Sequence, residues 1–130
     1  MPELIAAPTR IPVPGGKVID EYVGRVTTGT ESVSVAHMVA PGGWTEPAQA
    51  PEFDEITVVL RGVVRVDIID GDGGTETVEV PAGQALVTRA GERVRYSTGD
   101  EETEYVAVCL PAFSPDTVNR DAETDEGATR

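Results

Sequence analysis

The stretch GWTEPAQAPEFDEITVVLRG, residues 43–62, begins and ends with glycine and carries a strand pattern in its second half. Residues 55–60 are rich in β-branched side chains, and Arg61-Gly62 supplies a turn before a second such run, Val63 to Ile69. Two runs of this kind around a short glycine turn are typical of a hairpin. This part of the chain therefore predicts antiparallel strands.

The rest of the sequence repeats the pattern of short strands and tight turns. A second glycine-bounded stretch, GQALVTRAGERVRYST at residues 83–98, places strands on either side of Ala90-Gly91. No long segment shows helical periodicity. Short strands at regular spacing favour an all-β fold, a closed antiparallel barrel or a jelly roll. Further strands are expected at residues 18–26, 32–40, 76–80 and 104–110.

The predicted domain organisation is one barrel with two extensions. Residues 1–16 are expected to form an arm with at most one short strand, and residues 17–113 to form the barrel. Residues 114–130 form a tail, in which Ser114 and Pro115 are suited to start a short helix. The polar, acidic end from Asp121 to Arg130 is expected to be disordered.

The two glycine-bounded stretches resemble the two motifs of the cupins. The first cupin motif runs Gly, five residues, His-x-His, three or four residues, Glu, six residues, Gly; here Gly43, Gln49-Ala50-Pro51, Glu55 and Gly62 keep that spacing. The second runs Gly, five residues, Pro-x-Gly, two residues, His, three residues, Asn. Here the same spacing is kept by Gly83, Arg89-Ala90-Gly91, Val94 and Thr98. The resemblance implies a single-domain cupin jelly roll.

In metal-binding cupins, side chains at four motif positions hold one ion inside the barrel. Carried over to this sequence, those positions are Gln49, Pro51, Glu55 and Val94, and only Glu55 remains a good ligand. We therefore expect no metal and no other cofactor. The sequence also resembles the ethanolamine-utilisation type of cupin and its small relatives, through runs such as Phe53-Asp54-Glu55 and Tyr105-Val106-Ala107-Val108.

Glu55 is the leading candidate for catalysis. By its motif position it points inward, and desolvation in an apolar barrel raises a carboxyl pKa into the range useful for a general acid or base. His37 and Tyr96 are the other candidate catalytic residues, as proton-transfer partners of Glu55. Residues expected to contact the substrate are Gln49, Trp44, Thr57, Val94 and Met38.

The amino-acid composition argues against some classes of binding partner. The net charge of −13 argues against binding nucleic acid or an anionic membrane. The single Cys excludes an intramolecular disulfide, and no apolar run is long enough to span a membrane. We expect a cytoplasmic protein that pairs as a homodimer, as cupins often do.

Three functions remain open from the sequence. The first is metal-independent acid/base chemistry on a small organic molecule, such as isomerisation, dehydration or cyclisation. The second is a non-catalytic module that binds or senses a small molecule. The third is a metalloenzyme with an unusual carboxylate site built from Glu46, Glu52 and Glu55.

Overall fold

A computed structural model describes residues 1–121, and in this part of the chain every regular element is a β-strand. The strands pair in antiparallel fashion throughout, as the sequence predicts. No helix long and apolar enough to cross a membrane occurs in residues 1–121. The segment predicted to be disordered, Asp121 to Arg130, lies outside the described residues apart from Asp121.

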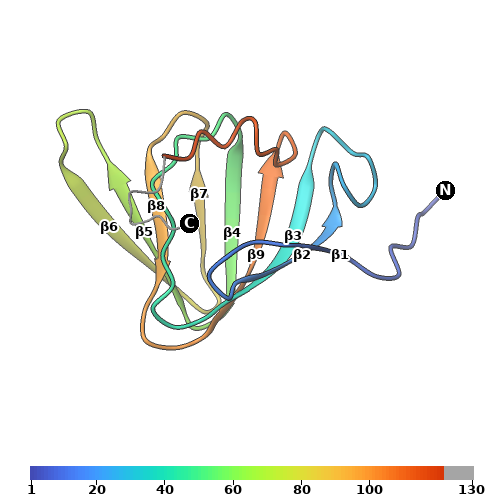
Figure 1. Cartoon of the computed structure of the whole chain (residues 1–130), viewed down its shortest axis with the longest axis horizontal. Helices are drawn as coiled ribbons and strands as arrows, with labels where there is room; N and C mark the ends of the chain where they lie inside the picture. Colours follow the sequence, from blue (N-terminus) through green and yellow to red (C-terminus); the bar gives the residue numbers. More distant parts are fainter. Residues whose placement is uncertain (122–130) are drawn as a thin grey trace.

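The strands form two sheets that face each other across a core (Figure 1). The larger sheet has six strands in the order β1 (Thr9–Ile11), β2 (Val18–Val23), β3 (Ser34–Ala40), β9 (Thr103–Leu110), β4 (Asp54–Arg61) and β7 (Ala85–Thr88). The smaller has three, in the order β6 (Thr75–Pro81), β5 (Val63–Ile69) and β8 (Val94–Thr98). This is a jelly-roll arrangement, but the two sheets are not closed into a continuous barrel.

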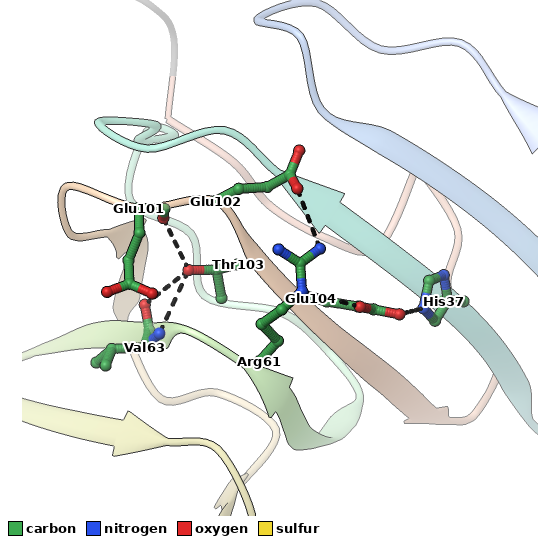
Figure 2. Close-up of polar contacts among 7 residues, drawn as sticks. All are labelled: His37, Arg61, Val63, Glu101, Glu102, Thr103 and Glu104. Atoms are coloured by element: carbon green, nitrogen blue, oxygen red, sulfur yellow. Dashed lines mark hydrogen bonds and ion pairs between the residues drawn. The ribbon is translucent and has the colours of Figure 1, made fainter.

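The core lies between the sheets because the strands alternate apolar and polar side chains. Val59, Val64 and Val66 are 0–1% exposed, and Tyr105 is 2% exposed. Thr103 links the sheets at one end: its buried hydroxyl donates to the carbonyl of Val63 at 3.3 Å and accepts from the Val63 amide at 3.3 Å (Figure 2). The two sheets are thereby held in one packed body.

The described part of the C-terminal tail forms a single turn and no helix. After the turn, its backbone is hydrogen-bonded to another segment of the chain. The Thr117 amide donates to the carbonyl of Ser114 at 3.1 Å, which closes one turn. The chain then runs along residues 48–52, where the amide of Glu52 donates to the Thr117 carbonyl at 2.9 Å and the amide of Asp121 to the Ala48 carbonyl at 2.8 Å. These bonds form in place of the predicted helix at Ser114. They place Arg120 opposite Gln49.

Candidate functional site

A cavity of about 470 Å³ opens between the inner face of the six-stranded sheet, the N-terminal arm and the segment after β3. Its volume is within the range of small-molecule sites in proteins. Its apolar lining includes Ile11, Val13, Met38, Phe53, Ala107 and Phe113. Its polar lining includes Lys17, Glu46, Gln49, Glu55, Tyr96 and Arg120. A few polar groups in an otherwise apolar cavity are the usual composition of a ligand site.

Glu55 is placed in this cavity by β4. On that strand it pairs with Cys109 of β9 and Thr88 of β7, so its side chain points to the inner face of the sheet. The pKa of Glu55 is raised from 4.5 to about 7, chiefly by burial and also by the charge of nearby Glu46, while Lys17 and Arg120 oppose the shift. A carboxyl group with such a pKa can both donate and accept a proton near neutral pH.

Lys17 is a second ionisable group in the cavity, and the sequence analysis did not single it out. Its ammonium lies 4.1 Å from the centre of the Trp44 ring and 5.3 Å from the centre of the Tyr105 ring. Burial lowers the pKa of Lys17, and the charges of Glu46 and Glu55 offset part of that effect. The signal that could have found it is its rarity, because the sequence contains one lysine.

Arg120 is the third group missed by sequence reasoning, and it reaches the cavity from the C-terminal segment. Its Nε and Nη2 donate to the side-chain oxygen of Gln49 at 3.1 and 2.9 Å. Its Nη2 also lies 3.5 Å from a carboxylate oxygen of Glu46, whose side chain is 12% exposed. Gln49 therefore lines the cavity and also orients a guanidinium at its edge.

Two tyrosines contribute hydroxyl groups near Glu55. Tyr96 lines the cavity as predicted, and its hydroxyl lies 3.2 Å from that of Thr88. Burial raises the pKa of both Tyr96 and Tyr105; the charge of Glu55 adds to the shift at Tyr96, and the charges of Glu46 and Glu55 add to it at Tyr105. Both hydroxyls therefore remain protonated and can act as hydrogen-bond donors.

His37 does not meet Glu55. Its neighbour Met38 lines the cavity, so strand alternation turns His37 to the outer face of the sheet. There its Nε2 lies 2.6 Å from Glu104, whose carboxylate also contacts Arg61 at 3.4 Å (Figure 2). The expected partnership of His37 with Glu55 is therefore not formed in this structure.

Thr57 and Val94 lie in the core and not on the cavity surface. Both are 1% exposed, and the described cavity lining contains neither. Val94 pairs through its backbone with Gln49. Of the eight residues predicted to form the site, the cavity brings together Glu55, Tyr96, Gln49, Trp44 and Met38.

The residues at the cupin metal positions do not fit a metal ion. Pro51 and Val94 have no donor atom in their side chains, and the side-chain oxygen of Gln49 is bound by Arg120. Within residues 1–121 no three His, Cys, Asp or Glu side chains gather in a way that could hold an ion. The alternative carboxylate site is thus not formed, since Glu52 is exposed and bound to Asn119 at 3.1 Å.

Comparison with solved structures supports the cupin-type fold. The chain superimposes on Bacillus subtilis oxalate decarboxylase with a TM-score of 0.75 and 19% identity, covering 89% of this chain and 31% of that one. A structure of the same enzyme at pH 4.6 gives a TM-score of 0.73, and another, concerned with its Mn(II) centres, gives 0.74. At this identity the likeness defines the fold alone. The architecture is that of a cupin jelly roll, as predicted.

One curated protein is similar in sequence. It is described as endoribonuclease YbeY of Myxococcus xanthus, and it is 44% identical over 107 residues, which cover 82% of this chain and 35% of that protein. The chain thus spans about a third of the length of the relative it matches. No protein-family model matches the chain.

Proposed function

We propose that this protein binds a small organic molecule in the cavity and carries out metal-independent acid/base chemistry on it. The observation that carries the proposal is Glu55: a carboxyl group with a pKa of about 7, in a largely apolar cavity large enough for a small molecule. Reactions of this kind include isomerisation, dehydration and cyclisation, each of which moves protons between carbon and oxygen atoms.

The polar groups around Glu55 suit defined roles in such a reaction. The hydroxyls of Tyr96 and Tyr105 would donate hydrogen bonds to an oxygen atom that gains negative charge. Arg120, oriented by Gln49, would hold an acidic group of the substrate. Glu55 would then transfer the proton at the reacting carbon or oxygen.

The RNA-cleaving activity named for the Myxococcus relative is not part of this proposal. Only about a third of that protein matches this chain, so its activity need not belong to the matching part. RNA binding requires cationic surface to contact phosphates, whereas this chain has a net charge of −13.

The titration of Glu55 can be followed without knowing the substrate, because the chain contains one tryptophan and it lines the same cavity. We expect the emission of Trp44 to change with a midpoint near pH 7, and Glu55→Gln to abolish this transition. Lys17→Arg is the matched control, because the Lys17 amine lies 4.1 Å from the centre of the Trp44 ring and burial lowers its pKa, whereas an arginine stays charged. A transition that persists in Glu55→Gln and disappears in Lys17→Arg would contradict the proposed role of Glu55.

Once a ligand is identified, the same variant separates an enzyme from a binding module. Loss of turnover with retained affinity in Glu55→Gln supports acid/base catalysis. Stable retention of an unchanged ligand by the unmodified protein supports the non-catalytic alternative, in which the cavity senses or stores a small molecule.

A further inference from the structure

Lys17 is the only lysine in a chain that has ten basic residues in total, the others being arginine. The two residue types differ in one property that matters inside a cavity. An arginine stays charged at any physiological pH, whereas a buried lysine can lose its proton and become a free amine. A cation needed only for charge balance could be either residue, but a nucleophilic amine requires lysine.

The surroundings of Lys17 are those of a reactive amine. Its side chain lines the cavity, with the amine between the rings of Trp44 and Tyr105. Within residues 1–121 the Lys17 amine forms no hydrogen bond or salt bridge, and its close neighbours are the two aromatic rings. Burial lowers the pKa of Lys17, which increases the fraction of free amine at neutral pH.

The same cavity contains the two other groups that imine formation needs. Glu55 can supply the proton that a leaving hydroxyl requires, because its pKa is about 7. Arg120 lines the cavity and can bind a carboxylate attached to the reacting carbonyl carbon. A carbonyl compound with an adjacent carboxylate, a 2-oxo acid, matches this set of nucleophile, acid and anion-binding group.

We propose that Lys17 is a catalytic residue that forms an imine with the carbonyl carbon of a small 2-oxo acid bound in the cavity. This inference rests on the proposed function, since Glu55 is the proton donor. The amine nitrogen attacks the carbonyl carbon, and proton transfer gives a neutral carbinolamine. Glu55 protonates the hydroxyl group, the C–O bond breaks, and water leaves as the C=N bond forms. The amine, the carbonyl and one proton thus yield a protonated imine and water.

Reductive trapping with pyruvate tests the proposal. The folded protein is incubated with pyruvate and cyanoborohydride near neutral pH, and adducts are located by mass spectrometry and peptide mapping. We expect Lys17 to gain the mass of pyruvate less one oxygen, and to react faster than the α-amino group of Met1. The α-amino group of Met1 is a strict internal standard, because Met1 is fully exposed and an ordinary α-amino group has a lower pKa than an ordinary lysine. Near neutral pH it is therefore expected to react faster than an ordinary lysine.

Three controls define the result. Lys17→Arg keeps the positive charge, and the only adduct expected in this variant is the one at Met1. An unchanged melting temperature shows that the variant is folded. Unfolding the unmodified chain in urea should make Lys17 react more slowly than Met1. Arg120→Met should slow trapping by pyruvate but not by acetaldehyde, which has no carboxylate.

The failure of this inference can be told from the failure of the proposed function. If Lys17 in the folded protein is not trapped, or is trapped more slowly than Met1, the imine proposal is wrong. The predicted titration of Glu55 is unaffected by that result. If Lys17 is trapped and Glu55→Gln slows the reaction about 100-fold, both stand, since general acid catalysis contributes effects of about that size. An unchanged rate in Glu55→Gln keeps Lys17 as the nucleophile and overturns the role of Glu55.

Discussion

At the scale of single residues, Glu55 couples the stability of the fold to pH. Its pKa is about 7 in the folded protein and near 4.5 when unfolded, so as the pH rises between these values the unfolded chain releases this proton first. The contribution of Glu55 is therefore fully present below about pH 4.5 and is lost as the pH rises through 7, a loss of roughly 3 kcal/mol at most. Glu55→Gln should lack this loss, as measured by urea unfolding at several pH values.

The informative quantity is the difference between the two proteins, because many other carboxylates titrate in this acidic chain. Glu55→Asp is a suitable control, since it retains a carboxyl group on the same strand and should retain a decline in stability with rising pH. An unmodified protein whose stability parallels that of Glu55→Gln from about pH 5 to pH 8 would show that Glu55 is not desolvated in the folded state.

The sequence predicts several cavity residues within the two motifs and misses two cations that lie outside them, Lys17 and Arg120. Glu55 and Gln49 follow from motif spacing, because that spacing fixes their positions relative to the glycine turns. Lys17 lies directly before β2 and Arg120 lies in the tail, and no periodic pattern marks either position, so their approach to the cavity depends on long-range contacts. The sequence prediction places both His37 and Met38 in the site, but adjacent residues of a strand face opposite sides.

At the scale of elements, the glycine turns of the motifs differ in what they tolerate. Gly62 and Gly83 both have positive φ, of 80° and 86°. A Cβ at Gly62 would clash with the Thr103 hydroxyl and lie 2.9 Å from a backbone oxygen, whereas at Gly83 no such atom lies within 4 Å. Gly83→Ala should cost about 1 kcal/mol, from backbone strain alone.

Gly62→Ala should cost about 2–4 kcal/mol, because it adds a steric clash at the junction between the two sheets to the same strain. Urea unfolding of both variants measures the difference directly. Equal losses of stability in the two variants would mean that the contact of residue 62 with Thr103 relaxes freely, and that this junction is not tightly packed.

The strands could be predicted because their alternation is local, and the tail could not because its partner is distant. Val63–Ile69 and Ala85–Thr88 have the predicted bounds, and the other predicted strands differ at their ends by a few residues. Ser114 and Pro115 do suit a helix start, but the backbone of Thr117 and Asp121 bonds to residues 48–52 instead. Such tertiary hydrogen bonds outweigh the marginal stability of an isolated short helix.

At the scale of the whole molecule, the outer face of the six-stranded sheet carries a continuous apolar row. Val35 of β3 pairs with Val108 of β9, which pairs with Ile56 of β4, which pairs with Val87 of β7. These side chains are partly exposed, and Val87 is 45% exposed. Because β-branched side chains side by side on a sheet form a flat apolar surface, this face is suited to burial against another sheet.

We expect two copies of the chain to pair through this face, so that sedimentation equilibrium gives twice the 13.7 kDa mass of one chain. Salt should strengthen the pair, since it screens the repulsion between two chains that each carry a net charge of −13. Val108→Glu should give a folded monomer, because it places a charge in the centre of the apolar row. Val26→Glu is the control, because Val26 is 63% exposed in the loop after β2 and should leave the dimer intact. A mass of one chain for the unmodified protein at high concentration and high salt would rule out this pairing.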